Sequence, residues 1–234
     1  MTSKEIPSLL KIRGLSVTYP SEEGEKKVVD NVDLQLAEGE IHGLAGESGA
    51  GKSTVGNAVI GLVTTPGKIT GGTISFLDQP INLGNDDNNG PIRRGRDIGV
   101  IFQDPLTSLN PLFTIESQIS ENMRFHLGLG PKEARTRSIE LIDAVGISEP
   151  EKRLDQYPHH LSGGMQQRVV IAMALSCNPK LIIADEPTTA LDVSIRAQIL
   201  KLVKKLCKER GVGVLLVTHD IGLISEVVDN ITIM

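Results

Sequence analysis

Apolar and polar residues alternate along the first part of the chain. They do so over residues 9–19 and again over residues 28–36, and this two-residue period is typical of strands with one buried face. Residues 67–76 also have strand character, and the glycines at their centre, Gly71 and Gly72, predict a hairpin turn. We therefore expect an antiparallel β layer at the front of the fold.

Short runs composed mainly of apolar residues predict strands that are buried on both faces. Such runs occupy residues 41–45, 98–102, 181–184 and 212–217, and another begins at 231. Helical patterns follow between the later runs, over residues 162–176, 193–210 and 221–228, and Gly211 ends the second of these helices. Strands that alternate with helices in this way predict a mostly parallel sheet with both faces covered.

The middle of the chain departs from this alternation. Residues 104–111 contain two prolines and predict irregular backbone. Residues 115–127 and 131–145 have a helical period, and residues 148–160 predict a polar helix and loop. We expect the whole stretch, residues 104–160, to form a helical subdomain inserted into one domain.

The remaining residues, 1–103 and 161–234, then form the α/β core of that single domain. Residues 83–96 are rich in glycine and asparagine and predict a surface loop. Because the sequence ends inside a strand-like run, we also expect that a C-terminal extension is missing from it.

A glycine-rich stretch separates the buried strand at 41–45 from a helix that begins near 54. It reads Gly46-Glu47-Ser48-Gly49-Ala50-Gly51-Lys52-Ser53, with Thr54 behind it, and it fits the phosphate-loop pattern G-x-x-x-x-G-K-[ST]. Its glycines let backbone N–H groups approach an anion, and the following helix directs its positive dipole end at the same point. Lys52 supplies a charge for the β- and γ-phosphates, and Ser53 offers a hydroxyl to Mg²⁺.

Two carboxylates, Asp185 and Glu186, follow the apolar strand 181–184. The carboxyl edge of a parallel sheet is where ligands bind. We expect Asp185 to hold Mg²⁺ opposite Ser53 and Glu186 to polarise the water that attacks the γ-phosphate. Without the phosphate loop, the same pair would be an ordinary strand end with two solvated acids.

A second glycine-rich segment opens the helix at 162–176. Ser162 is a suitable N-cap, and the backbone N–H groups of Gly163 and Gly164 would form another anion site. The alternative is a capped helix with a flexible entry. Only the other motifs in the chain favour the anion site.

Together these motifs resemble those of the nucleotide-binding subunits of ATP-binding cassette (ABC) transporters. The likeness covers residues 10–234, and the motifs follow the family's order: the phosphate loop, Gln103, Leu161-Ser162-Gly163-Gly164 with Gln166, Asp185-Glu186, Ala190-Leu191-Asp192 and His219. Met165 stands where glutamine is most frequent in that family. The resemblance implies a P-loop NTPase core of the α/β class with a mostly parallel sheet, an N-terminal antiparallel β layer and an inserted helical subdomain.

The resemblance also implies that the chain binds ATP and Mg²⁺ and hydrolyses ATP. Tyr19 would stack on adenine, although a strand aromatic in the core is the alternative. Gln103 would contact Mg²⁺ and relay the state of the nucleotide to a membrane partner. His219 would contact the γ-phosphate and act with Glu186 and Lys52 in catalysis.

In this family two subunits form a head-to-tail dimer around two ATP molecules. The resemblance implies that one copy closes over the ATP held by residues 46–54 of the other, through Ser162, Gly163, Gly164, Gln166 and Asp192. Closing and reopening of the dimer would drive transport. The partners would be a second ABC ATPase subunit, identical or not, two transmembrane permease subunits and a periplasmic or extracellular solute-binding protein.

Three segments narrow the resemblance to importers of dipeptides, oligopeptides and nickel. They are residues 103–111, 157–160 and 186–193. This subfamily implies a peripheral place on the cytoplasmic face of the inner membrane. It leaves the substrate open.

Composition excludes some classes of protein. The formal charge of −5 and pI of about 5.6 argue against a nucleic-acid partner. Cys177 and Cys207 lack the spacing of a disulfide or metal motif and are expected to be reduced core thiols. The N-terminus has no apolar signal segment, and no apolar run approaches the roughly 20 residues of a membrane helix, so a membrane role would depend on partners.

Other phosphate-loop proteins are the rival readings. GTPases carry a guanine-reading Asn/Thr-Lys-x-Asp motif, and no lysine here is followed two positions later by aspartate. A small-molecule kinase would not need the second glycine-rich segment. A soluble ABC-type ATPase that is not coupled to transport remains the alternative, although the long coiled coil of DNA-repair members is absent from this sequence.

Overall fold

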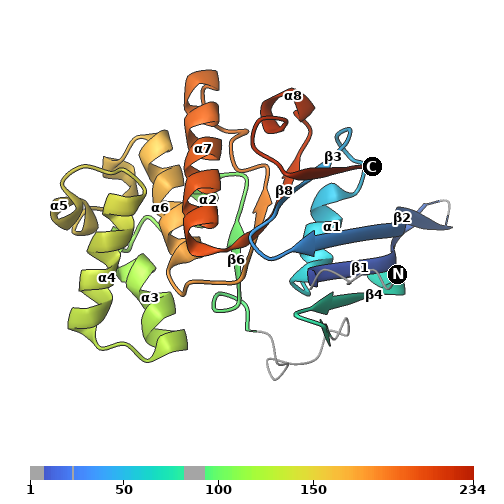
Figure 1. The fold of residues 1–234 in the computed structure, drawn as a ribbon, viewed down its shortest axis with the longest axis horizontal. Coiled ribbons are helices and arrows are strands. Elements are labelled where there is room, and N and C mark those ends of the chain that lie inside the picture. Colours follow the sequence, from blue (N-terminus) through green and yellow to red (C-terminus); the bar gives the residue numbers. More distant parts are fainter. Residues whose placement is uncertain (1–7, 23, 82–92) are drawn as a thin grey trace, which may run out of the picture.

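The computed structural model describes residues 8–22, 24–81 and 93–234. Within these residues the chain forms an antiparallel sheet, a parallel sheet and a group of helices (Figure 1). This is the α/β class that the sequence predicted. Most of the surface loop expected at 83–96 lies outside the described residues.

The antiparallel sheet contains the predicted front strands. Its order is β2-β1-β4-β5, and its strands are β1 (Ser8–Ser21), β2 (Gly24–Ala37), β4 (Lys68–Phe76) and β5 (Gln79–Pro80). Leu10, Ile12, Leu15 and Val17 of β1 are fully buried. The alternating pattern therefore identified the buried face of this strand correctly.

The hairpin expected around Gly71 and Gly72 is wrong. The chain continues through both glycines as one strand, β4, which pairs with β1 and shifts register between Arg13 and Ser16. Gly72 has a φ of 92°, and a Cβ there would lie 2.6 Å from the carbonyl oxygen of Arg13. The two glycines thus form a bulge where β1 approaches closely, instead of a turn.

The parallel sheet has the order β6-β7-β8-β3-β9. Its strands are β3 (Ile41–Ala45), β6 (Ile98–Ile101), β7 (Leu181–Asp185), β8 (Gly213–Thr218) and β9 (Asn230–Ile233). Every residue of β3 and β8 is buried, as the mainly apolar runs predicted. Because all neighbouring pairs are parallel, the carboxyl ends of the strands meet at one edge.

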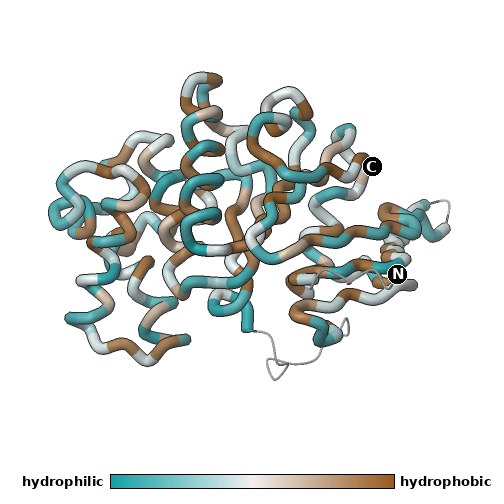
Figure 2. Tube along the Cα trace, viewed as in Figure 1, coloured by the Kyte–Doolittle hydropathy of each residue, from teal (hydrophilic) through white to brown (hydrophobic). Residues whose placement is uncertain are grey.

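Each face of the parallel sheet has its own apolar core. One face packs against α6 (Gly163–Leu175) and α7 (Val193–Arg210). The opposite face packs against α1 (Lys52–Val59) and the antiparallel sheet. In Figure 2 the central strands carry long hydrophobic stretches, whereas the outer helices show hydrophilic turns towards the outside.

Residues 104–160 contain helices and loops only. The helices are α2 (Pro105–Ser108), α3 (Ile115–Leu127), α4 (Pro131–Ala144), α5 (Pro150–Leu154) and the 3₁₀ turn η1 (Pro158–His160). The segment predicted to be irregular thus includes one turn of helix, capped by Asp104, whose carboxylate accepts from the Leu106 N–H at 2.9 Å. The last helix, α8 (Ile221–Ile224), is shorter than expected.

Arg135 of α4 links α3 and the end of α5 through hydrogen bonds. Its guanidinium donates to Glu116 of α3 and, at 2.9 Å, to Asp155 after α5. Arg168 of α6 donates to the carbonyl of Val145 at the end of α4. Among the described residues, no helix is both long and apolar enough to span a membrane.

Candidate nucleotide site

The predicted site residues follow the carboxyl ends of four neighbouring parallel strands. The ladder pairs Ala45 of β3 with Thr218 of β8, and Asp185 of β7 with Val217 of β8. The residues that follow these ends therefore lie at the same edge: Gly46 after β3, Glu186 after β7, His219 after β8 and, next to β7, Gln103 after β6. This is the edge at which ligands bind in open α/β sheets.

The glycines of the phosphate loop are required by the fold itself. Gly49 and Gly51 have φ values of 85° and 90°, a region that side chains with a Cβ rarely adopt. A Cβ on Gly51 would lie 2.4 Å from the Val28 carbonyl oxygen, and one on Gly46 would lie 2.5 Å from that of Met234. Strand β2 and the end of β9 thus confine the loop, while Glu47, Ser48 and Gly49 remain exposed.

Lys52 lies inside the curl of the loop. Its side chain is 5% exposed, and its Nζ donates to the carbonyls of Gly46 at 3.0 Å and Glu47 at 2.7 Å. The ammonium group is therefore held at the centre of a ring of backbone, at the start of α1. A positive charge beside a helix N-terminus is an arrangement suited to phosphate.

Ser53 and Asp185 come together from distant parts of the sequence. The Ser53 hydroxyl donates to Asp185 Oδ1 at 2.9 Å. Burial raises the pKa of Asp185, and the neighbouring Glu186 carboxylate raises it further. A half-buried carboxylate paired with a hydroxyl is a hard oxygen donor set whose negative charge a Mg²⁺ ion would stabilise.

Glu186 is held in place by three contacts. Its backbone has a φ of 46°, and its N–H donates to the Val217 carbonyl at 2.9 Å. Its carboxylate accepts from the Thr189 hydroxyl at 2.9 Å and from His219 Nδ1 at 2.8 Å. Burial raises the pKa of Glu186, but the hydrogen bonds from His219 and Thr189 outweigh burial and the pKa is lowered.

The second glycine-rich turn lies at the surface. Ser162 is the N-cap of α6, and its Oγ accepts from the Met165 N–H at 3.4 Å. Ser162 and Gly163 are exposed, and Gly164 is half-buried. Asp192, at the start of α7, is also exposed and makes no side-chain capping bond.

Comparison with known proteins gives a family for this constellation. A family model described as "ABC transporter" matches residues 29–189. The oligopeptide transport ATP-binding protein AppD of Bacillus subtilis is 46% identical over 228 residues, which cover 97% of this chain and 69% of that protein. The dipeptide transport ATP-binding protein DppD of Escherichia coli K12 is 43% identical over 227 residues, which cover 97% and 69%. This chain belongs to the ABC transporter family.

Solved ABC cassettes have the same fold. The dimeric bacterial ABC transporter cassette MJ0796 gives a TM-score of 0.81 at 35% identity, covering 96% of this chain and 94% of that one. A dimeric post-hydrolysis state of MJ0796 bound to ADP and Pi gives 0.79 at 34% identity, with the same coverage. The resemblance found in the sequence is thereby confirmed, and the chain is an ATP-binding ABC ATPase with a P-loop α/β core.

Two residues of the predicted ABC site have surroundings that differ from their expected roles. Gln166 was expected to face another subunit's ATP, but it is 5% exposed, and its Nε2 donates to the carbonyls of Pro158 and Leu161 at 2.8 and 3.2 Å. Its side chain therefore holds the turn before α6. Tyr19 is half-buried, and its ring packs so closely on Gly67 that a Cβ there would lie 2.4 Å from it.

The sequence analysis missed Thr189 and Arg196. Thr189 holds the catalytic candidate Glu186, and Arg196 Nη2 holds the Thr189 carbonyl at 3.2 Å. Arg196 Nε also donates to the Leu191 carbonyl at 2.8 Å. The only available signal was that a hydroxyl follows Glu186 three positions later, in a stretch with a proline that predicts a turn.

Proposed function

We propose that this chain is the ATP-hydrolysing subunit of an importer for dipeptides or oligopeptides. The observation that carries this is the sheet edge, where Ser53 meets Asp185 and where His219 and Thr189 hold Glu186. The peptide substrate class is supported by the names of the relatives, AppD and DppD. Nickel import stays open as an alternative substrate.

In this proposal each residue at the edge has one task. The loop amides, Lys52 and the α1 N-terminus bind the β- and γ-phosphates. Ser53, Asp185 and Gln103 would hold Mg²⁺, which would neutralise charge on the phosphates. Glu186, kept ionised by its donors, takes a proton from the attacking water, and His219 holds that carboxylate in position.

The exposed turn at Ser162, Gly163 and Gly164 supports a second subunit in the proposal. Its backbone N–H groups begin a helix of 13 residues and face the surface, so another copy's ATP has access to them. Asp192 would lie at the same interface. The dimeric state of MJ0796 supports such a pairing, while Gln166 would act indirectly by holding the turn.

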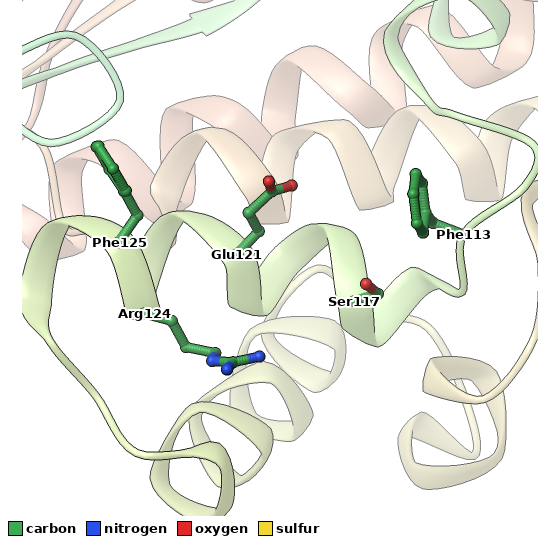
Figure 3. A pocket seen from close by; sticks show the side chains of 5 residues that line it. All are labelled: Phe113, Ser117, Glu121, Arg124 and Phe125. Carbon is green, nitrogen blue, oxygen red and sulfur yellow. The ribbon is translucent and has the colours of Figure 1, made fainter.

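A groove along α3 supports docking of a membrane subunit. It has a volume of about 470 Å³ and is lined by Phe113, Ser117, Glu121, Arg124 and Phe125. Phe113 and Phe125 stand at its two ends with Glu121 between them (Figure 3). Their side chains are 52% and 82% exposed, and exposed aromatics of this kind mark protein contacts.

The proposal therefore places the chain on the cytoplasmic face of the membrane, bound to two permease subunits that receive peptide from a solute-binding protein. An ABC ATPase with no transport partner is the second candidate. It would leave the groove and its exposed aromatic side chains without a role.

Replacement of one groove residue separates the two candidates. Phe125→Glu should abolish co-purification of the chain with its permease subunits, because a charge replaces an exposed aromatic contact, and should leave ATP hydrolysis by the isolated chain unchanged. Leu62→Glu, another exposed apolar position at 40% exposure, is the matched control. Permease association that survives Phe125→Glu would contradict docking at this groove.

A further inference from the structure

The last strand of the parallel sheet, β9, lies at the sheet edge beside β3. The ladder places Asn230 opposite His42 and Thr232 opposite Leu44. Ile231 and Ile233 of this strand are 41% and 67% exposed. Burial of apolar surface therefore contributes little to holding β9 on β3.

The apolar side chains of β9 also do not define its register. Ile231 and Ile233 are two positions apart, so they face the same side of the strand. A shift of two residues would replace one isoleucine by the other near Gly43, where an added Cβ would lie 3.4 Å from Ile231. That face would be almost unchanged, so the register depends on polar contacts: those of Asp229 just before the strand, which accepts from the Ile41 N–H at 2.8 Å, and those of the opposite face.

The opposite face carries a chain of polar side chains around the buried His42. His42 is 7% exposed, and its Nδ1 lies 3.0 Å from Glu40 Oε1 while its Nε2 lies 2.8 Å from Thr232 Oγ1. An ionised carboxylate only accepts hydrogen bonds, so Nδ1 carries the proton and donates it to Glu40. In the neutral ring, Nε2 then accepts from the Thr232 hydroxyl.

Glu40 is fixed from two further directions. Its Oε2 accepts from the Ala37 N–H at 2.7 Å, and its Oε1 accepts from Asn230 Nδ2 at 2.8 Å. A shift of β9 by two residues would carry Thr232 away from His42 and leave a buried imidazole nitrogen without its partner, which is costly. In the observed register, each of these contacts of His42 and Glu40 is made.

The residue that follows β9, Met234, contacts the start of the phosphate loop directly. The Met234 N–H donates to the Ala45 carbonyl at 2.9 Å. The Met234 carbonyl oxygen lies 2.5 Å from the position that a Cβ on Gly46 would take. Gly46 is the first residue of the loop, so the position of β9 along β3 decides which backbone group confines the loop's entry.

We propose that the hydrogen bond between His42 and Thr232 fixes the register in which β9 pairs with β3. By fixing this register, it positions the phosphate loop for ATP. Both are positioning residues, which act through Met234 and Gly46 and touch no nucleotide. The inference rests on the nucleotide role proposed for residues 46–54.

Thr232 offers the cleanest test because Thr→Val keeps the shape and removes only the hydroxyl. Thr232→Val should raise the KM for Mg-ATP about five-fold, the equivalent of one ordinary hydrogen bond, with kcat within about two-fold of wild type. Hydrogen exchange should become faster at the amides of residues 46–50 and 230–234. Thr232→Ser, which keeps the hydroxyl, should restore both.

Thr136→Val is the matched control, since Thr136 is exposed on α4 and its hydroxyl donates to the Lys132 carbonyl at 3.1 Å. The inference is overturned if Thr232→Val has wild-type KM, if exchange at residues 46–50 does not change, or if Thr136→Val shows the same loss. His42→Leu should reproduce Thr232→Val. If His42→Leu fails to fold, the Thr232 pair decides.

One comparison separates failure of this inference from failure of the proposed function. Wild type and Lys52→Ala are titrated with Mg-ATP beside Thr232→Val. Equal affinity of wild type and Lys52→Ala would refute the nucleotide role of the loop, and the inference with it. Tight binding by wild type, loss in Lys52→Ala and wild-type binding by Thr232→Val would overturn the inference alone.

Discussion

The chain has two glycine-rich turns, one before α1 and one before α6, and each opens a helix. The turn before α1 is enclosed: Gly51 lies against the backbone of β2, Gly46 lies against that of Met234, and Lys52 Nζ donates to two carbonyls of the turn. The turn before α6 is open. A Cβ on Gly163 would meet no atom closer than the Leu191 side chain at 4.0 Å.

This difference shows which half of the site one chain can complete. Around the enclosed turn, Ser53, Asp185, Glu186 and His219 already hydrogen-bond one another in pairs. The open turn has its internal support from Gln166 and Ser162, but its outward amides face the surface. The fold requires glycine in the turn before α1, which suggests that this turn binds the nucleotide of its own chain. The fold does not require glycine at Gly163, which suggests that the turn before α6 acts on another molecule.

The largest expected effect lies in the enclosed half. Glu186→Gln removes the carboxylate proposed to accept the proton from water and should lower turnover roughly 10²- to 10⁴-fold. ATP should still bind, and an ATP-bound dimer should accumulate because the reopening step is lost. Steady-state phosphate release and size-exclusion chromatography with ATP measure the two effects.

Glu226→Gln serves as the control, because Glu226 is an exposed glutamate outside the sheet edge. Turnover of Glu186→Gln close to that of wild type would refute the assigned role. It would also remove the reason to regard the enclosed turn as the hydrolytic half.

The two glycines themselves give the next prediction. Gly51→Ala should destabilise the fold by about 2 kcal/mol or more, because φ is 90° and the new Cβ would collide with the Val28 carbonyl at 2.4 Å. Gly163→Ala should change stability by less than about 1 kcal/mol. It should instead weaken ATP-dependent dimerisation about tenfold, since the added methyl group would displace the phosphate of the other subunit's ATP from the backbone N–H groups of this turn.

Thermal unfolding and analytical ultracentrifugation with ATP test this pair. The comparison of the two turns fails if Gly163→Ala destabilises the monomer as much as Gly51→Ala does. It also fails if Gly163→Ala dimerises with wild-type affinity.

Sequence patterns predicted the sheet edge well because they depend on strand ends. Apolar runs at 41–45 and 181–184 located β3 and β7, and parallel pairing then brought Gly46 and Glu186 to one side. The pairing of β4 with β1 could not be predicted from strand ends in the same way. Gly71 and Gly72 have the local chemistry of a turn, and only the distant strand β1 makes them a bulge.

The burial of Gln166 could have been predicted from the sequence. Residues three and four positions later on the helix, Val169 and Val170, share its face and are buried. Its side chain was therefore more consistent with the interior than with a partner's ATP. By contrast, the contact of Thr189 with Glu186 depends on the left-handed backbone at Glu186, which no period in the sequence indicates.

The smallest expected effect concerns the donors that keep Glu186 ionised in the enclosed half. Thr189→Val removes one of the donors that lower the pKa of Glu186. The pKa of this carboxylate should then rise towards its ordinary value. Because turnover requires the ionised form, the acid limb of kcat/KM should move to higher pH, with little change at neutral pH.

The sign follows from which form the donor stabilises. A hydroxyl that donates to the carboxylate favours the charged state, so its loss allows protonation to begin at a higher pH as the solution is acidified. Thr189→Ser keeps the donor and should retain the wild-type limb, and the bond from Arg196 to the Thr189 carbonyl preserves the backbone in both variants. An acid limb in Thr189→Val that coincides with wild type would mean that His219 alone sets the ionisation of Glu186.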